Sequence, residues 1–175
     1  KHEIDLMKKG TILISFVYVL HYTDIAKKCA EKGIDLISMD MIPRTTLAQK
    51  MDVLSSQANI AGYKSVILAA NELGKIFPLM MTAAGTISPA KVVIMGAGVA
   101  GLQALGTAKR LGAVVEVSDI RTAVKEEVQS LGGRFIEVEG AEDMQDSGGY
   151  AKEASPEFLQ KQKETIFKHV TEADI

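Results

Sequence analysis

The sequence contains a single cysteine, Cys29, and no tryptophan among its 175 residues. One thiol cannot form an internal disulfide, and its helical spacing from Ile25 predicts a buried side chain that packs as a small apolar group. A bilayer span needs roughly 20 apolar residues, and the longest run, 12–20, is shorter and interrupted by Ser15. We therefore expect neither a disulfide scaffold nor a membrane anchor in this sequence.

Excess charge of either sign is also missing. Lys and Arg total 20 against 22 Asp and Glu, a formal net charge of -2, so we expect no binding to nucleic acid through a general basic surface. The 47% hydrophobic and 24% charged content is that of an ordinary globular protein. No signal or transit peptide is recognisable, and the start at Lys1 without an initiator methionine indicates a segment of a longer chain.

The three histidines do not form a metal-ligand spacing with Cys29 or with a cluster of carboxylates, and no nucleophile elbow is present. The sequence therefore predicts no metal site and gives no support to acyl-transfer chemistry.

The first 50 residues predict a strand, a helix and a second strand. Residues 11–20 are rich in β-branched and aromatic types, 23–32 have helical spacing, and 34–39 are again apolar. Gly33 is a typical helix stop. A single β-α-β unit cannot bury both faces of its parallel strand pair. We therefore predict that residues 1–50 are the C-terminal part of an α/β domain.

A long helix is predicted between about residues 51 and 77, followed at 82–89 by a linker. Small residues form one face of this helix, which indicates close packing against another backbone: Ala58, Ala61, Gly62, Ser65 and Ala69. Pro78 is expected to end the helix. Residues 51–89 are thus interpreted as an interdomain helix and linker.

Strand and helix patterns alternate from residue 90 onward. The expected strands are 91–95, 113–118 and 134–138, and the expected helices are 99–111, 122–131 and 156–169. This alternation is typical of a Rossmann-type parallel sheet. The predicted fold class is α/β: residues 90–175 form the first half of a nucleotide-binding domain, with the next strand beginning at 173–175, joined by the long helix to the end of another α/β domain.

The turn after the strand at 91–95 carries a G-x-G-x-x-G motif made of Gly96, Gly98 and Gly101. The first glycine allows the tight turn, the second lets a pyrophosphate approach the backbone, and the third lets helix and strand pack closely. Val99 and Ala100 then provide backbone N–H groups in the first turn of the helix. The flanking strand and helix make a dinucleotide site a much stronger interpretation than an empty glycine turn.

Asp119 lies at the end of the next strand, 18 residues after Gly101. A carboxylate at this position accepts hydrogen bonds from the adenosine ribose hydroxyls and repels a 2′-phosphate, so NAD(H) is predicted in preference to NADP(H). Ile120 continues the cofactor-binding segment. Arg121 is either an ordinary surface arginine near a helix start or a residue able to receive a 2′-phosphate.

Several stretches resemble the NAD(H)-binding domain of proton-translocating nicotinamide nucleotide transhydrogenases, of the alpha-subunit type. They are 43–63 (PRTTLAQKMDVLSSQANIAGY), 81–85 (MTAAG), the glycine motif, 108–113 (AKRLGA) and 148–152 (GGYAK). The resemblance covers nearly the whole chain and is weakest before Pro43. Alanine dehydrogenases share the two-domain architecture, but the residues at 52–63 are more similar to those of a transhydrogenase.

The resemblance implies that an Arg-Gln-Asp loop enters the nicotinamide end of the site, matched here by Arg44, Gln49 and Asp52, with Ser55 beside them. Gln49 would hold the carboxamide or ribose, and Arg44 the pyrophosphate, the loop or the partner nucleotide. Asp52 would pair with Arg44 or hold the ribose, although a surface ion pair or helix cap is its ordinary interpretation. Tyr150 would belong, with Gly148 and Gly149, to a loop that closes over the bound nucleotide, whereas by residue type alone residues 140–150 are an exposed acidic loop.

The function implied is hydride transfer from NADH to NADP⁺, with NADP(H) held on a partner domain, coupled to proton movement by a membrane domain of the same enzyme. A homodimer on the soluble face of that membrane enzyme is also expected. Two other interpretations remain open at this point. One is an NAD-dependent dehydrogenase of the alanine dehydrogenase type, and the other is a non-catalytic NAD-binding module.

Overall fold

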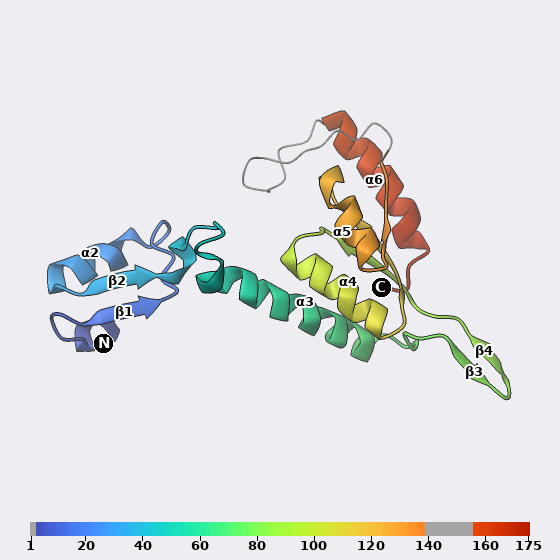
Figure 1. Cartoon of the computed structure of the whole chain (residues 1–175), viewed down its shortest axis with the longest axis horizontal. Coiled ribbons are helices and arrows are strands. Elements are labelled where there is room, and N and C mark those ends of the chain that lie inside the picture. The colour runs from blue at the N-terminus through green and yellow to red at the C-terminus, as the bar shows by residue number, and fades with distance from the viewer. Residues whose placement is uncertain (1–2, 139–155) are drawn as a thin grey trace. The chain divides into compact units, whose positions relative to one another are not determined.

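The computed structural model describes residues 3–138 and 156–175, and the chain divides into two compact units, Lys1–Ser56 and Gln57–Ile175 (Figure 1). Both contain parallel strands connected by helices, as the sequence predicts. Over the described residues, none of the helices combines the length and apolar character needed to cross a bilayer.

The first unit is built on two parallel strands. It runs through α1 (Glu3–Leu6), β1 (Ile12–Ser15), α2 (Thr23–Lys32) and β2 (Asp35–Ser38), with Ile12 paired to Asp35. Gly33 ends α2 in the left-handed conformation at φ 64°, a backbone shape that favours glycine. Cys29 packs in the core of this unit with Ile4 and Ile34, which confirms its expected role as a buried apolar side chain.

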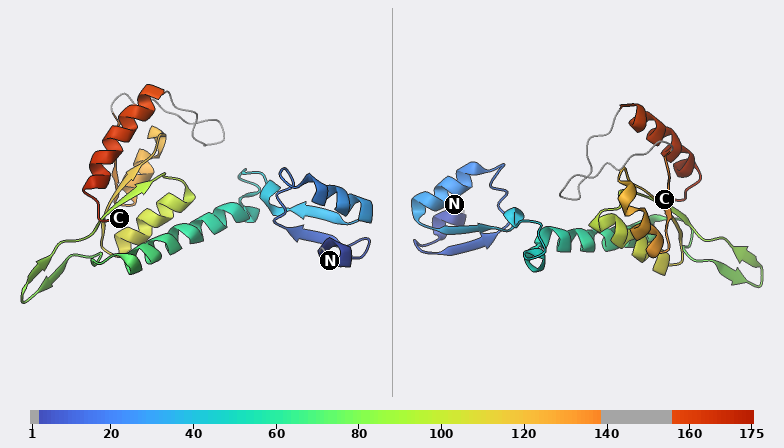
Figure 2. Two further views of the ribbon diagram at one scale, coloured as in Figure 1. Left: turned by 180° about the vertical axis from the view of Figure 1, so that it is seen from behind. Right: turned by 45° about the horizontal axis from the view of Figure 1, so that its top comes forward.

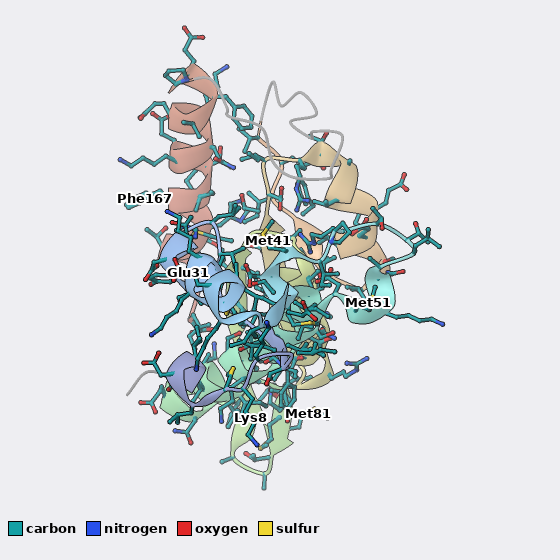
Figure 3. The ribbon with its side chains drawn as sticks, turned by 90° about the vertical axis from the view of Figure 1, so that its left-hand side faces the viewer. Lys8, Glu31, Met41, Met51, Met81 and Phe167 are labelled. Carbon is teal, nitrogen blue, oxygen red and sulfur yellow. The ribbon has the colours of Figure 1, made fainter. Side chains whose placement is uncertain are left out.

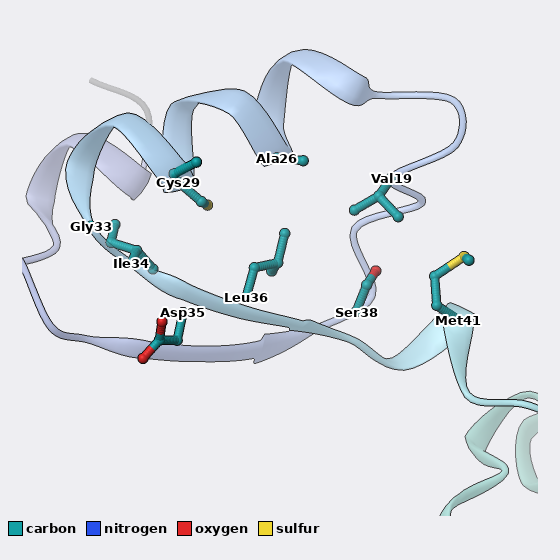
Figure 4. Close-up of a pocket in the computed structure, with 10 residues that line it drawn as sticks. Val19, Ala26, Cys29, Gly33, Ile34, Asp35, Leu36, Ser38 and Met41 are labelled. Atoms are coloured by element: carbon teal, nitrogen blue, oxygen red, sulfur yellow. The ribbon is translucent and has the colours of Figure 1, made fainter.

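Strand β1 is shorter than the predicted 11–20. The reason is Asp40, whose Oδ1 accepts hydrogen bonds from the backbone N–H groups of Val17 and Tyr18, each at 3.1 Å. Those two amides therefore cannot join a strand ladder, and Tyr18 takes a φ of 53°. A cavity of about 610 Å³ lies over α2 and β2, with Cys29, Leu36 and Met41 among its lining residues (Figure 4).

Two 3-10 turns, η1 (Met39–Met41) and η2 (Gln49–Met51), lead into the long helix α3 (Val53–Glu72). The helix is shorter at both ends than the predicted 51–77. Asp52 bonds the first turn from outside the helix, and Gly74, a poor helix former, follows soon after its end.

The predicted linker at 82–89 is wrong in part, because an antiparallel hairpin forms from β3 (Met80–Thr82) and β4 (Gly85–Ile87). The turn is closed by the hydroxyl of Thr82, which donates to the Gly85 carbonyl at 3.0 Å, and Gly85 takes a φ of 141°. Figures 1 and 2 show the hairpin extending away from the sheet of its own unit. Met81 on the hairpin, labelled in Figure 3, is 79% exposed.

The second unit contains a three-stranded parallel sheet in the order β5 (Lys91–Met95), β6 (Val114–Ser118), β7 (Arg134–Phe135). The connections are α4 (Val99–Arg110) between the first two strands, and η3 (Thr122–Val124) with α5 (Lys125–Ser130) between the second and third. α4 and α5 cover one face, where Leu105, Val117 and Val128 are fully buried. Glu116 alternates with the buried valines of β6, and its Oε2 lies 2.7 Å from Nδ1 of His169 on α6 (Pro156–Thr171).

Residues 174–175 lie along the edge of β5 opposite to β6. Val93 N–H donates to the Ile175 carbonyl at 2.8 Å, and Ile175 N–H donates to the Lys91 carbonyl at 3.3 Å, while the carbonyl of Ala90, just before β5, accepts from Val114 on β6. This is the bonding pattern of a parallel neighbour. The strand order therefore reverses at β5, and in open α/β sheets ligands bind at the carboxyl end of such a reversal.

Candidate functional site

The turn between β5 and α4 leaves the amino end of α4 open. Gly96 turns the chain at φ 99°, and its N–H donates to the Ser118 carbonyl of β6 at 2.7 Å. Gly98 precedes α4 without a side-chain cap, and a Cβ placed on it would meet nothing within 4 Å. The first N–H groups of a helix have no partner within it, so the backbone of Val99 and Ala100 is available to an anion.

The third glycine of the motif makes the close approach of α4 to the sheet possible. A Cβ on Gly101 would lie 1.8 Å from the carbonyl oxygen of Gly96, a distance that no pair of non-bonded atoms tolerates. The turn and the first turn of the helix therefore fit together only without a side chain at this position. The geometry agrees with the tight turn expected at Gly96 and the close packing expected at Gly101, and the space beside Gly98 is open, as the approach of a dinucleotide pyrophosphate would require.

Asp119 is tied directly to this turn from the end of β6. Its Oδ2 accepts a hydrogen bond from Ala97 N–H at 2.7 Å, and its side chain is 7% exposed. Burial by itself raises the pKa of the Asp119 carboxyl, but hydrogen bonds from Arg121 and Ala97, together with the Arg121 charge, hold that pKa below its usual value. The carboxylate is thus ionised and fixed beside the glycine motif.

Arg121 is not an ordinary surface arginine, because its side chain is 15% exposed and folded onto Asp119. Its Nε donates to Oδ1 and its Nη2 donates to Oδ2, both at 2.9 Å, and its backbone N–H donates to Oδ1 at 2.9 Å. Ile120, between them, is partly exposed. The glycine motif, Asp119 and Arg121 are therefore brought together at one edge of the sheet.

A second group of predicted residues meets in the first unit, at the start of α3. Asp52 Oδ1 accepts from Ser55 N–H at 2.9 Å, and Asp52 Oδ2 accepts from the Ser55 hydroxyl at 2.6 Å. The first bond is a helix N-cap, the ordinary role expected for such an aspartate. Arg44 completes the group: its Nη2 donates to the Ser55 hydroxyl at 2.7 Å, and its Nε lies 3.4 Å from Asp52 Oδ2.

These contacts set the charge state of Asp52. Hydrogen bonds from the Ser55 hydroxyl and backbone hold the pKa of Asp52 below its usual value, and Arg44 adds to this effect. Gln49 lies in η2, three residues before Asp52, and its side chain is exposed. Tyr150 lies outside the described residues.

Two residues that the sequence did not single out also belong to the glycine cradle. Ala97 supplies the amide that holds Asp119, and Ser118 has a hydroxyl that is buried without a hydrogen-bond partner in the described part of the chain. The strand position just before Asp119 could have pointed to Ser118, whereas nothing in the residue type of Ala97 indicates its role.

The fold and the site together define a dinucleotide-binding α/β protein of the Rossmann type. Comparison with known proteins narrows this class. The profile of the alanine dehydrogenase/PNT C-terminal domain matches residues 65–175, and that of the alanine dehydrogenase/PNT N-terminal domain matches residues 1–61. The chain belongs to the alanine dehydrogenase/PNT family.

Individual relatives point to one branch of this family. The chain is 47% identical to the first part of NAD(P) transhydrogenase subunit alpha of Rhodospirillum rubrum, over 99% of this chain and 46% of that protein. It is 46% identical to NAD(P) transhydrogenase subunit alpha of Cereibacter sphaeroides, over 99% of this chain and 34% of that subunit. The chain thus spans less than half the length of these relatives.

Solved structures also resemble this chain more closely when they are transhydrogenases than when they are alanine dehydrogenases. The transhydrogenase from Sinorhizobium meliloti superposes with a TM-score of 0.85 at 43% identity, covering 98% of this chain and 45% of that one. An L-alanine dehydrogenase superposes with a TM-score of 0.60 at 25% identity, covering 76% of this chain and 38% of that one. The predicted resemblance to transhydrogenase alpha subunits is confirmed, with alanine dehydrogenase more distant.

Proposed function

We propose that this chain provides the NAD(H)-binding part of a transhydrogenase that transfers hydride between NADH and NADP⁺. The observation that carries the proposal is the bond between Asp119 Oδ2 and the Ala97 amide, at 2.7 Å. It fixes an ionised carboxylate beside the open amino end of α4, where an adenosine ribose and a pyrophosphate need an acceptor and donors, respectively.

NAD(H) is the nucleotide we assign to this cradle, and NADP(H) is assigned to a partner domain. Gly98 and the first turn of α4 would hold the pyrophosphate, and Asp119 would hold the ribose hydroxyls. The nicotinamide supplies the hydride, so this chain needs no general acid or base and has to place the ring correctly.

We assign that placement to Gln49, whose amide offers both a donor and an acceptor. Arg44, Asp52 and Ser55 form a bonded group at the start of α3 that orders the segment carrying Gln49. The group supports a positioning role, since each member restrains another. Tyr150, which lies outside the described residues, is proposed to close over the nucleotide.

Proton translocation is assigned to a membrane domain elsewhere in the enzyme, with this chain on its soluble face.

A homodimer is part of the proposal, and the hairpin β3–β4 supports it. Leu79, Met80, Met81 and Ile87 expose apolar side chains there, more than a protein surface normally gathers in one small element. Met81→Ser, compared with wild type by analytical ultracentrifugation, should shift a dimer toward monomer, and an unchanged mass would argue against the hairpin as its interface.

Nucleotide affinity tests the binding proposal. Nucleotide fluorescence titration of the complete polypeptide that contains this chain should show tighter binding of NADH than of NADPH, and Asp119→Ala should remove most of that preference. Equal affinities in the wild type would refute the role of Asp119.

Hydride transfer tests the catalytic proposal. Gln49→Ala in the intact enzyme should slow transfer to an NADP⁺ analogue while leaving NADH binding nearly intact, because the residue places the ring. Oxidation of NADH that depends on pyruvate and ammonia would instead favour an alanine dehydrogenase. Binding of NADH without any transfer when the partner domain is present would favour a non-catalytic module.

A further inference from the structure

The carboxylate of Asp119 already accepts as many hydrogen bonds as it can. An ionised carboxylate has two oxygens and about four acceptor positions in all. Oδ1 accepts from the backbone N–H and the Nε of Arg121, and Oδ2 accepts from Ala97 N–H and Arg121 Nη2. A ribose diol that donates to both oxygens therefore has to displace an existing donor.

The four donors differ in how easily they can leave. Ala97 N–H belongs to the turn that the hydrogen bond of Gly96 holds against β6. The position of the Arg121 backbone N–H is set by the path of the backbone just after β6. Moving either one would deform the cradle itself. The guanidinium of Arg121 is carried by a flexible side chain, so rotation about the side-chain bonds removes both of its hydrogen bonds to Asp119 and leaves the backbone unchanged.

We infer that Arg121 is a displaceable partner of Asp119. The Arg121 guanidinium bonds the two carboxylate oxygens that the ribose would use, and it sets the nucleotide preference of the site. This inference rests on the proposed NAD(H) function and gives that site a specificity-determining residue. The ribose of NADH replaces the guanidinium, and the two backbone donors keep the carboxylate in place during the exchange.

The exchange has opposite consequences for the two nucleotides. With Arg121 present, NADH has to break a bidentate, mostly buried charge pair before its ribose binds. A nucleotide with a 2′-phosphate meets a pair whose charges cancel, and the released guanidinium is a phosphate donor two residues away. Arg121 therefore weakens NADH binding and improves NADPH binding. It reduces the preference for NADH over NADPH that Asp119 creates.

Arg121→Gln tests this in the complete polypeptide, with NADH and NADPH affinities measured by fluorescence titration. We expect NADH to bind roughly threefold to tenfold more tightly than to wild type, since a charge-assisted competitor has been removed. NADPH should bind more weakly, because Asp119 then repels its 2′-phosphate without compensation. Arg121→Lys keeps the charge but cannot bond both carboxylate oxygens in the same way. Its NADH and NADPH affinities should therefore lie between those of wild type and Arg121→Gln.

Arg110→Gln is the matched control, since Arg110 is exposed at the end of α4 and its loss changes the net charge equally. It should change both affinities little and by the same factor. An Arg121→Gln protein that binds NADH as tightly as wild type or more weakly would overturn the inference. Failure of the wild type itself to bind NADH would instead overturn the proposed function.

A structure of the wild-type complex with NADH provides a second test that does not depend on a variant folding. We expect the ribose hydroxyls on Asp119, with Arg121 Nε and Nη2 beyond hydrogen-bond distance of its oxygens and the Ala97 bond retained. A complex in which both guanidinium bonds persist would refute displacement.

Discussion

Gly62 of α3 lies directly against the carbonyl of Ala100 in the first turn of α4. A Cβ on Gly62 would be 2.1 Å from that oxygen and 3.0 Å from the Ala100 Cα. Helix α3 therefore packs on the backbone of the first turn of α4, the turn that is proposed to bind the pyrophosphate, and it helps to hold that turn in place. Figure 2 shows the second part of α3 alongside α4.

Gly62→Ala should destabilise the protein and weaken NADH binding. The new methyl group has to push α3 away from a backbone atom, which typically costs about 1–3 kcal/mol of unfolding free energy. Chemical denaturation and NADH titration would measure the two effects.

Gly106→Ala is the matched control within α4. Its Cβ would have an ordinary contact of 3.9 Å, so better helix propensity should raise stability by about 0.5–1 kcal/mol. If both variants behaved alike, the close contact between Gly62 and Ala100 would have no energetic importance.

Gly98→Ala and Gly101→Ala should separate binding from folding. The Gly98 Cβ would meet no protein atom within 4 Å, so the variant should keep its Tm and lose NADH affinity, because the methyl group enters the space of the ligand. The Gly101 Cβ would lie 1.8 Å from the Gly96 carbonyl oxygen. The Gly101→Ala variant should therefore have both a lower Tm and a lower NADH affinity. Thermal denaturation with and without NADH measures this, and full NADH affinity in Gly98→Ala would contradict the assignment of the cradle.

Asp52→Ala should lower Tm by roughly 2–5 °C, because α3 loses its N-cap bond to Ser55. Asp52→Ser keeps a capping oxygen and removes the charge, so its Tm should stay near that of wild type. Hydride transfer in Asp52→Ser then reports on the contacts of the carboxylate with Arg44 and with the Ser55 hydroxyl. A rate equal to wild type would show that the cap, and not the charge, is what Asp52 contributes.

Asp119 should make stability depend on pH on the acidic side. The pKa of this carboxyl is lower in the folded protein than the ordinary 3.8, so the folded state favours the ionised form. The resulting stability is fully present above the unfolded-state pKa and is lost as the pH falls through the lower, folded-state value. Denaturation curves collected from pH 6 down to pH 2, values chosen to bracket about 3.8, should therefore fall more steeply for wild type than for Asp119→Asn. Parallel curves would mean that the bonds to Arg121 and Ala97 do not favour the ionised carboxyl.

The local patterns were sufficient wherever a short segment decides its own conformation. Helix 23–32 with its Gly33 stop and the strand at 91–95 occur as predicted. The sequence predicts a linker over part of the hairpin at 80–87, since the two strands are short and exposed and lack the alternation of a half-buried sheet. Strand β1 is shorter than its apolar pattern predicts, because the carboxylate of Asp40, 22 residues or more along the chain, accepts hydrogen bonds from the amides of Val17 and Tyr18.

The sequence by itself determined the α/β class, the family resemblance and the glycine motif with its acidic partner, because these depend on residue types at fixed short spacings. Only the tertiary structure decided what those residues contact. It placed Arg121 on Asp119, the Ala97 amide on the same carboxylate, and Gly62 against Ala100. Each of these contacts depends on the exact path of the backbone and on a chosen rotamer, neither of which hydrophobic periodicity encodes.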